Sequence, residues 1–446
     1  MEELTKKIIS LTKRKGFVFP SSLIYGGFSS TYDFGPRGAA LKNNLKKAWW
    51  NEMTKRQKDV VGLDSAIIMN PEIWQASGHL SKGFADKLSE CKSCHQRFKD
   101  LEEDGKSTEE CPNCGGELMD PRDFNLMMKT FVGPVEDNAT TAYLRAETCQ
   151  GIFVNFKNVM DSMRVDLPFG IAQIGKSFRN EITPGNFIFR MREFEQMEMQ
   201  WFCKKEDADD FFEFWLNQRL NWYERMGIDM SKLRKNEIGE DERAHYAQRQ
   251  VDIEYKFPFG WGEIEGIHNR GDWDLSNHSK HSDADFEVDG EYPWVIETSI
   301  GVERSFLAFL TDSYHEMEEG REDDSGKKET VLRIGRKLAP TKVAVFPLLK
   351  NKESLVEKAE EVFDKIRKDF DSIYDETGSI GKRYRRQDEV GTPLCVTVDF
   401  DSLEDDSVTI RERDSMKQIR VNIEDLNKVI SQFMKGEEFV SLGKEV

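Results

Sequence analysis

The segment from Phe178 to Phe202 constrains the fold of this chain more than any other stretch. From Gln196 to Trp201 polar and apolar residues alternate strictly, so a strand there would carry one polar and one apolar face. Residues 183–186 read Thr-Pro-Gly-Asn, which is turn chemistry, because proline fixes φ and glycine accepts a positive φ. The pattern therefore predicts two antiparallel strands joined by a turn.

The polar face of this hairpin has two interpretations. Strand parity gathers seven side chains on it: Arg179 and Glu181 from the first strand, and Arg192, Phe194, Gln196, Glu198 and Gln200 from the second. In the first interpretation the face is solvated and salt-bridged. In the second it holds a nucleotide, because arginine grips phosphate in a bidentate fork, glutamate accepts from an exocyclic amine and phenylalanine stacks on a base.

The identity of the residues favours the second interpretation. The run FRNE at 178–181, followed by RMREF at 190–194 and FEQME at 194–198, resembles motif 2 of the class II aminoacyl-tRNA synthetases, in the form found in the dimeric glycyl-tRNA synthetases. The resemblance implies an α+β fold in which helices flank an antiparallel sheet that binds ATP.

Composition limits the other function classes. A chain of 446 residues is too long for one compact core, so two or three domains are expected. The net charge of −18 argues against general adhesion to nucleic acid, so contacts with RNA must use local basic patches. The longest apolar interval, near Val343–Leu349, contains a proline, and no membrane-spanning segment is expected. The N-terminus lacks the apolar core of a signal peptide, which favours a cytoplasmic location.

A helix is predicted after Gly35-Pro36. The apolar residues between Ala40 and Trp49 recur at helical spacing, which is typical of an ordinary core helix. The segment YGGFSSTYDFGPRGAALKNNLKKAWW, residues 25–50, also resembles motif 1, which in this family is a long helix and strand at the dimer interface. The resemblance implies a homodimer.

Residues 85–120 hold two CxxC pairs, Cys91 with Cys94 and Cys111 with Cys114, separated by 16 residues. Two such knuckles deliver four thiolates to one tetrahedral ion, so the spacing predicts a structural zinc ribbon. A ribbon that has lost its metal and a redox pair are the alternatives. Paired CxxC units fit a reducing compartment better than a disulfide framework. The resemblance places this module as an insertion between motifs 1 and 2.

Two further segments resemble the amino-acid pocket and motif 3. The run RAETCQG, residues 145–151, follows the family pattern Arg-Pro-Glu-Thr-Ala-Gln-Gly, with Ala146 in place of proline and Cys149 in place of alanine. The resemblance implies that Glu147 contacts the ammonium of glycine; without it, Glu147 is a surface glutamate. The run ETSIGVER, residues 297–304, has the form of motif 3, a strand end, a glycine and a helix start that favours anionic oxygens, with Thr298 replacing the usual proline.

The segment between motifs 2 and 3 also resembles part of the ATP site. A helix is predicted over Asp241–Gln250 and a strand over Val251–Phe257. In the following GWGEIEG run, Glu263 and Glu265 are expected on one strand face, where they bind Mg²⁺ or ribose or are simply exposed carboxylates. His268 is expected to be structural.

From Pro340 onward, strand and helix patterns alternate, which predicts a small α/β domain with a mixed sheet. This domain resembles the anticodon-binding domain shared by the glycyl, threonyl, prolyl and histidyl synthetases. Within it, Gly381–Arg386 is the most basic hexamer of the chain. It is either a solvated loop or a contact for tRNA phosphates.

The resemblance covers nearly the whole chain and implies which residues bind each substrate. For ATP they are Arg179, Asn180, Glu181, Phe189, Arg190, Met191, Arg192, Glu193, Phe194, Glu263, Ile264, Gly301, Val302, Glu303 and Arg304. For glycine they are Glu147, Phe194, Glu195, Gln196, Met197, Glu198, Glu297, Thr298, Ser299, Ile300 and Gly301. Arg179 and Arg304 are the implied catalytic residues and hold the α- and γ-phosphates, while Mg²⁺ offsets the phosphate charge.

The implied domains are a catalytic domain over residues 1–84 and 121–335, a zinc-ribbon-like insertion over 85–120 and an anticodon-binding domain over 340–446. The implied reaction joins glycine to the 3′ end of tRNA(Gly) through glycyl-adenylate, at the expense of ATP. One alternative is a class II enzyme for proline, threonine or serine. Another is a non-catalytic relative that keeps the fold to bind nucleic acid, like the accessory subunit of a mitochondrial DNA polymerase, against which the retained phosphate-binding arginines count.

Overall fold

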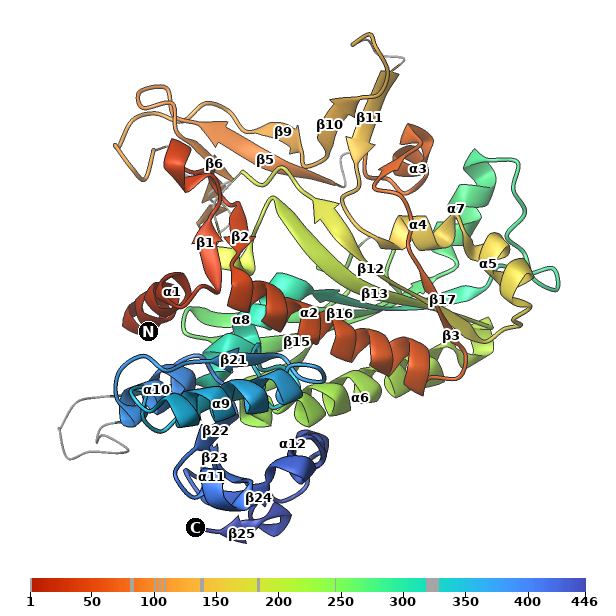
Figure 1. The fold of residues 1–446 in the computed structure, drawn as a ribbon. Helices are drawn as coiled ribbons and strands as arrows, with labels where there is room; N and C mark the ends of the chain where they lie inside the picture. Colours follow the sequence, from red (N-terminus) through yellow and green to blue (C-terminus); the bar gives the residue numbers. More distant parts are fainter. Residues whose placement is uncertain are drawn as a thin grey trace.

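The computed structural model describes residues 2–80, 84–99, 102–103, 106–107, 110–136, 140–182, 185–244, 246–317 and 329–446. These residues form a large mixed unit around one sheet and a smaller α/β unit at the C-terminal end (Figure 1). Within the ranges given, no helix is both long enough and apolar enough to cross a membrane.

The large unit is built on a seven-stranded sheet with the order β14-β15-β16-β17-β13-β12-β3. Its strands are β3 (Val60–Leu63), β12 (Phe169–Phe178), β13 (Glu193–Cys203), β14 (Leu233–Glu237), β15 (Arg249–Phe257), β16 (Gly260–Gly271) and β17 (Trp294–Gly301). Neighbouring strands are antiparallel, except β12 and β3, which are parallel. The predicted antiparallel sheet is therefore the centre of the molecule.

Helices cover one whole face of this sheet and one end of the other. The first face carries α2 (Pro36–Asn51), α6 (Ala208–Met226) and α8 (Val302–Ser313), with Met197, Met199 and Trp201 of β13 in the shared apolar core (Figure 1). The second face is covered at one end by α4 (Cys149–Phe153), α5 (Phe156–Met163) and α7 (Trp273–His281). The rest of the second face borders a cavity.

The predicted hairpin is confirmed as an antiparallel pair, in which Phe178 of β12 faces Glu193 of β13. Its connection is longer than a turn, because residues 179–192 lie between the strands and include a short 3-10 helix at Phe187–Phe189. Thr183 and Pro184 of the predicted turn lie outside the described residues. The interpretation of a solvated polar face is wrong, since the polar side chains of β13 on that face are buried: Gln196, Glu198 and Gln200.

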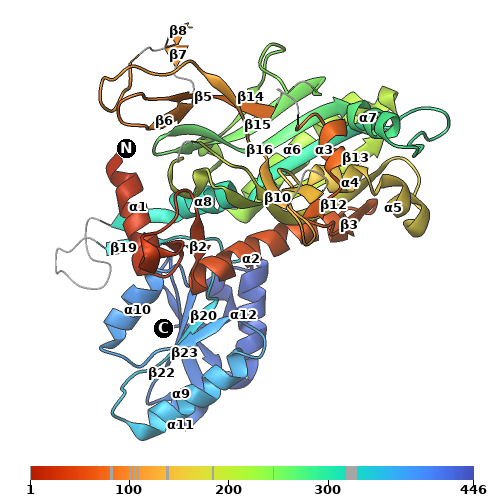
Figure 2. The same cartoon turned by 90° about the horizontal axis from the view of Figure 1, so that it is seen from above.

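A smaller sheet system lies beside the main sheet (Figure 2). It holds β5 (Ala85–Glu90), β6 (Arg97–Lys99) and β9 (Arg122–Asn125) in one sheet, and β4 (Ile68–Met69), β10 (Met128–Phe131) and β11 (Thr141–Leu144) in another, with α3 (Pro71–Ala76) nearby. A separate pair is formed by β7 (Glu102–Glu103) and β8 (Lys106–Ser107). The CxxC pairs lie in this system.

The remaining elements of the large unit flank the sheet. They are α1 (Glu2–Arg14), β1 (Val18–Pro20), β2 (Tyr32–Phe34), β18 (Tyr314–Met317) and β19 (Glu329–Leu332). β1 pairs with β2 and β18 pairs with β19, both antiparallel. Gly38 in the first turn of α2 is required by packing, because a Cβ atom there would lie 1.8 Å from the carbonyl oxygen of Phe17.

The C-terminal unit has the predicted mixed sheet, in the order β21-β20-β22-β23-β24-β25. Its elements are β20 (Val343–Pro347), α9 (Glu353–Ile366), β21 (Ser372–Tyr374), α10 (Ile380–Asp388), β22 (Leu394–Val398), α11 (Ser402–Asp405), β23 (Ser407–Glu412), β24 (Gln418–Asn422), α12 (Leu426–Lys435) and β25 (Lys444–Glu445). β20 is parallel to β21 and β22, and the remaining pairs are antiparallel. α9 and α12 share a second apolar core with the sheet.

The interpretation of the basic hexamer Gly381–Arg386 as a solvated loop is wrong, because it lies within α10. Arg383 is buried and donates to the carbonyl oxygens of Pro347 and Gly378. Arg386 forms an ion pair with Asp375 at 2.6 Å. Most of the cationic groups of the hexamer are therefore engaged within the protein.

Candidate active site

The polar face of the sheet borders a cavity of about 450 Å³. Its walls come from the β12–β13 connection, from β13, β16 and β17, from the first turn of α8 and from the segment before β15. The predicted site residues that line it are Glu147, Arg179, Glu181, Phe189, Arg190, Met191, Phe194, Gln196, Glu198, Glu263, Glu297, Ser299, Gly301, Glu303 and Arg304. Residues that are up to 157 positions apart in the sequence thus line the same cavity.

Both predicted catalytic arginines line this cavity. The guanidinium of Arg179 lies 5.4 Å from the ring centre of Phe194 and 5.6 Å from that of Phe84, and its Nε donates to the carbonyl oxygen of Ala146 at 3.2 Å. These contacts hold a cation between two aromatic rings.

Arg304 lies in the first turn of α8, beside Glu263 of β16 and Phe189 of the β12–β13 connection. Its Nη1 donates to a carboxylate oxygen of Glu263 at 2.8 Å, and its guanidinium lies 4.5 Å from the ring centre of Phe189. Burial raises the pKa of Glu263, but the charge of Arg304 outweighs it and lowers the pKa below its usual value. The pair leaves a planar cation and a carboxylate side by side on the cavity wall.

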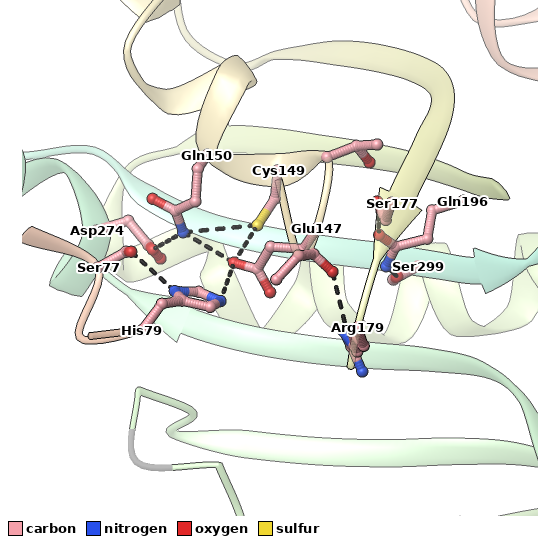
Figure 3. Close-up of polar contacts among 12 residues, drawn as sticks. Ser77, His79, Glu147, Cys149, Gln150, Ser177, Arg179, Gln196, Asp274 and Ser299 are labelled. Atoms are coloured by element: carbon pink, nitrogen blue, oxygen red, sulfur yellow. Dashed lines mark hydrogen bonds and ion pairs between the residues drawn. The ribbon is translucent and has the colours of Figure 1, made fainter. Parts of the chain in front are cut away.

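Three buried carboxylates also line the cavity: Glu147, Glu198 and Glu297. The Oε1 atom of Glu147 accepts from the thiol of Cys149 at 2.9 Å and from the amide of Gln150 at 3.0 Å (Figure 3). It also lies 3.4 Å from Nε2 of His79. Burial opposes ionisation of Glu147, yet His79 holds its pKa well below the usual value.

Glu297 is surrounded by nitrogen donors that stabilise its ionised form. Nη1 of Arg270 donates to it at 3.0 Å, the amide of Gln200 donates at 2.6 Å, and Nδ1 of His268 lies 2.9 Å away. Burial raises the pKa of Glu297, but Arg270 and His268 overcome it and lower the value to about 2. Glu297 is therefore ionised at neutral pH.

Glu198 lies in a different electrostatic environment from Glu297. Its oxygens accept from the hydroxyl of Ser299 at 2.7 Å, from the amide of Gln196 at 2.9 Å and from the hydroxyl of Thr148. Burial, Glu297 and Glu147 together raise its pKa to about 7. Neutral donors do not compensate two neighbouring negative charges, so Glu198 exchanges its proton near neutral pH.

A buried network supports this carboxylate cluster. Arg270 donates to both oxygens of Asp274, at 2.7 and 2.9 Å, and lies 3.7 Å from the ring centre of Tyr246. Gln150 links Asp274 to His278, with contacts of 3.2 and 2.8 Å. These partners fix the orientation of Glu147 and Glu297.

Sequence reasoning missed several residues of this network. His79, Arg270 and Asp274 were not among the predicted site residues, and His268, expected to be only structural, lines the cavity beside Glu297. The signal available in the sequence was the density of ionisable residues in HNRGDWD, residues 268–274. Nothing in the sequence connects His79 with Glu147, because the zinc-ribbon-like module separates them.

The remaining predicted site residues do not line the cavity: Asn180, Arg192, Glu193, Glu195, Met197, Ile264, Thr298, Ile300 and Val302. On the strands the reason is parity, since alternate side chains point to the other face of the sheet. Met197, Ile264 and Ile300 lie in the apolar core, and Glu195 pairs with Lys42 and Lys46 at 2.6 and 2.9 Å. Arg192 donates to the carbonyl oxygen of Glu181.

Two local predictions between motifs 2 and 3 are wrong. Residues 241–244 and 246–248 form turns and irregular structure instead of a helix, and β15 starts at Arg249. Glu242, Arg243 and Tyr246 of this segment line the cavity. Glu263 and Glu265 do not share a face, because a β-bulge at Ile264 changes the register with β15. Glu265 is instead fully buried in an ion pair with Arg219 of α6 at 2.7 Å.

The four cysteines Cys91, Cys94, Cys111 and Cys114 converge, with their Sγ atoms within 4.8 Å of one another. The backbone N–H groups of Ser93 and Cys94 both donate to Sγ of Cys91 at 3.4 Å, which shapes the first knuckle. Gly115 shapes the second with a φ of +71°. Four converging thiols are the donor set of a structural zinc ion, so the residues fit this metal.

Comparison with known proteins agrees with this geometry. The family model "tRNA synthetase class II core domain (G, H, P, S and T)" matches residues 130–314, and the model "Anticodon binding domain" matches residues 342–433. The fold expected for the core and for the C-terminal domain is confirmed.

Curated relatives match over nearly the full length. A protein of Borrelia hermsii named glycine–tRNA ligase is 54% identical over 432 residues, which are 94% of this chain and 95% of the relative. Those of Treponema denticola and Thermobifida fusca are 51% and 48% identical, covering 93% and 97% of this chain and 94% and 99% of the relatives. With such identity over more than nine-tenths of its length, this chain belongs to the glycine–tRNA ligase family of class II aminoacyl-tRNA synthetases.

Proposed function

We propose that the cavity on the polar face of the sheet is where this chain carries out the reaction of its family. ATP and glycine form glycyl-adenylate and pyrophosphate, and the glycyl group then passes to the 3′ end of tRNA(Gly). The observation that carries the proposal is that Arg179 and Arg304 line the same cavity as three buried carboxylates, Glu147, Glu198 and Glu297. The phosphates of ATP require cations, and the ammonium group of glycine requires carboxylates.

ATP lies against Arg179 and Arg304 in this proposal. Arg179 binds the α-phosphate and Arg304 the γ-phosphate, while Glu181 accepts from the adenine amine and Phe194 stacks on the base. Mg²⁺ enters with ATP and neutralises phosphate charge. Glu263 is the predicted carboxylate available to the metal or the ribose, because Glu265 is buried against Arg219.

Predicted ATP residues that do not line the cavity can contribute only through the main chain or by shaping the walls. They are Asn180, Arg192, Glu193, Ile264 and Val302. For the glycine site the same holds for Glu195, Met197, Thr298 and Ile300.

Glycine lies against the three buried carboxylates in this proposal. Its ammonium lies among Glu147, Glu198 and Glu297, and Ser299, which donates to Glu198 at 2.7 Å, stands beside it. A larger amino acid would press its β-carbon against these buried polar groups and leave them without partners, which costs free energy. Because glycine is the smallest amino acid, no smaller competitor has to be rejected, and no editing step is required.

The chemistry needs no side-chain base. The glycine carboxylate attacks the α-phosphorus in line, the new bond is an acyl–phosphate anhydride, and the bond to pyrophosphate breaks with its electron pair leaving on pyrophosphate. A carboxylate is already a nucleophile, so the protein supplies position and charge stabilisation. A ribose hydroxyl of the tRNA then attacks the carbonyl carbon of the adenylate, and AMP leaves.

The cysteine cluster is proposed as a structural zinc site. Its four thiols lie within 4.8 Å of one another, and among the described residues between 85 and 120 the buried apolar side chains are Leu88, Cys91 and Cys111. Binding of the metal would therefore supply folding free energy to this module. We also propose that the chain divides into a catalytic domain over residues 1–84 and 121–335, the cysteine module over 85–120 and an anticodon-binding domain over 340–446.

A homodimer and a cytoplasmic location are also proposed. The loop between β1 and β2 exposes Leu23, Ile24, Tyr25 and Phe28, with Ile24 and Tyr25 each 87% exposed, which is the kind of apolar surface that a second copy covers. Thiol pairs built for a metal suit a reducing compartment. Sedimentation of the wild type against an Ile24→Asp variant tests the dimer, since a monomeric wild type contradicts it.

Pyrophosphate exchange tests the main proposal. With each amino acid supplied in turn, glycine should drive exchange, and alanine, serine, threonine and proline should fall below it by a factor of about 10² or more. Exchange driven by proline, threonine or serine would favour an enzyme for that amino acid. No exchange with any amino acid would favour a protein that only binds nucleic acid.

A further inference from the structure

A second cleft, of about 330 Å³, lies at the junction of the large unit and the C-terminal unit, away from the ATP cavity. Four chain segments line it: the end of α6 at Arg225–Gly227, the connection at Arg333–Lys337, Arg413–Asp414 after β23, and the end of α12 at Met434–Gly436. Figure 1 shows α6 and α12 facing one another at this junction. The cleft therefore belongs to neither unit alone.

The charge of this cleft is opposite to that of the chain. Its basic residues are Arg225, Arg333, Arg336, Lys337, Arg413 and Lys435, and its acidic residue is Asp414. The whole chain carries a net charge of −18. A local basic concavity in an acidic protein attracts anions of the kind that the rest of the surface repels.

Three of the arginines form a fixed floor. Arg413 is buried and donates to the carbonyl oxygens of Ile334 and Gly391, each at 2.9 Å. Arg336 donates to the carbonyl oxygen of Phe433 at 2.7 Å, at the C-terminal end of α12. Arg225 pairs with Glu52 at 2.5 Å. The contacts of Arg413 and Arg336 join the connection between the units to the C-terminal unit, and Arg225 is held within the large unit.

The other three cations are exposed and available to a ligand. Arg333 reaches Asp414 only at 3.8 Å, and its side chain is 39% exposed. Lys337 and Lys435 are exposed. In the described part of the chain neither lysine has a carboxylate within ion-pair distance.

We infer that this cleft binds the sugar–phosphate backbone of tRNA between its acceptor end and its anticodon. The inference rests on the proposed function, because an RNA that reaches both the ATP cavity and the C-terminal unit must span the two units that meet at this cleft. Phosphate oxygens suit exposed lysine and arginine groups, and such contacts need no base identity. The contiguous basic hexamer of α10 cannot take this role with its buried and paired arginines, Arg383 and Arg386.

A matched pair of double variants tests this inference. Lys337→Glu/Lys435→Glu reverses two charges in the cleft, and Lys58→Glu/Lys204→Glu reverses two exposed charges elsewhere on the large unit. Binding of tRNA(Gly) is measured by filter retention across a range of salt. The cleft variant should weaken binding about tenfold or more at low salt and make the salt dependence shallower by about 1 to 2 in the log–log slope.

Pyrophosphate exchange separates this inference from the proposed function. Exchange uses only glycine and ATP, so the cleft variant should keep the wild-type rate while its KM for tRNA in aminoacylation rises. Equal tRNA affinity in the two double variants would overturn the inference even if exchange is normal. Absence of exchange in the wild type would instead overturn the proposed function, and filter binding would still report on the cleft.

Inorganic tripolyphosphate serves as a small-anion probe. If the cleft variant loses tripolyphosphate binding but keeps tRNA affinity, the cleft is a small-anion site and the inference is wrong. Hydroxyl-radical footprinting gives the supporting outcome: backbone protection between the acceptor stem and the anticodon loop that the wild type gives and the cleft variant lacks.

Discussion

Nε2 of His79 lies 3.4 Å from Oε1 of Glu147, although 67 residues and the whole cysteine module separate them in the sequence. The other ring nitrogen of His79 lies 2.8 Å from the hydroxyl of Ser77. Ser77 and Glu147 thus hold the His79 ring at its two nitrogen atoms and fix its orientation. Oε1 is held by His79, Cys149 and Gln150, and in the proposed function Oε2 is the atom that meets the ammonium of glycine.

Replacement of His79 by phenylalanine should raise KM for glycine about tenfold and leave KM for ATP unchanged, because Glu147 loses one of the donors that orient it. Initial rates of pyrophosphate exchange measure both constants. His79→Gln keeps a donor and should recover most of the loss. An equal rise in both KM values would indicate general distortion of the fold and would contradict the positioning role.

The proton of Glu198 should make glycine binding depend on pH. Its pKa is raised to about 7, so the group is protonated below that pH and cannot pair with an ammonium. The value of kcat/KM for glycine should therefore increase with pH up to about 7 and level off above it. Glu198→Gln should lower kcat/KM and flatten this limb of the profile, measured by exchange between pH 5.5 and 8.5. A wild-type profile without the limb would show that Glu198 takes no part.

Arg179→Ala should reduce pyrophosphate exchange by a factor of about 10² to 10³, because a cation that stabilises charge on the α-phosphate is lost. Affinity for tRNA should stay close to that of the wild type, measured by filter binding. Arg190→Ala offers a comparison, since Arg190 also lines the cavity but is not proposed to bind a phosphate of ATP. Undiminished exchange in Arg179→Ala would refute the phosphate-binding role.

The native protein should contain one zinc ion per chain, measured by atomic absorption. Cys111→Ser should release it and make the module around residues 85–125 sensitive to protease, because the metal supplies folding free energy there. Cys203→Ser, at a buried thiol outside the module, should keep the zinc. A native protein without metal would favour a ribbon that has lost its ion or a redox pair.

The buried pair Arg219–Glu265 should be sensitive to removal of one partner. Their side chains are 1% and 0% exposed, so Arg219→Met leaves a carboxylate buried without its counter-ion. The expected loss is about 3 to 5 kcal/mol in the free energy of unfolding, measured by denaturant titration. The double variant Arg219→Met/Glu265→Leu should recover much of it, and equal stability of single and double variants would contradict this account.

The strand patterns of the core and the order of the motifs could be predicted from the sequence, because alternation and spacing act over a few residues. Met197, Met199 and Trp201 do enter the core, and the strand, glycine and helix of residues 294–313 are as expected. The bulge at Ile264 could not be predicted in this way, since one additional residue in β16 moves Glu265 to the other face without changing the local pattern.

By itself, the sequence determined the alternation that makes β13 two-faced, the four-thiol spacing and the residue types that suit ATP and an ammonium group. Only the tertiary structure decided which charges meet: His79 beside Glu147, Arg270 beneath Glu297, and a basic cleft assembled from four distant segments. The physical reason is range. Backbone preference is fixed by near neighbours, whereas the pKa of a carboxylate and the charge of a cleft depend on groups brought together by packing.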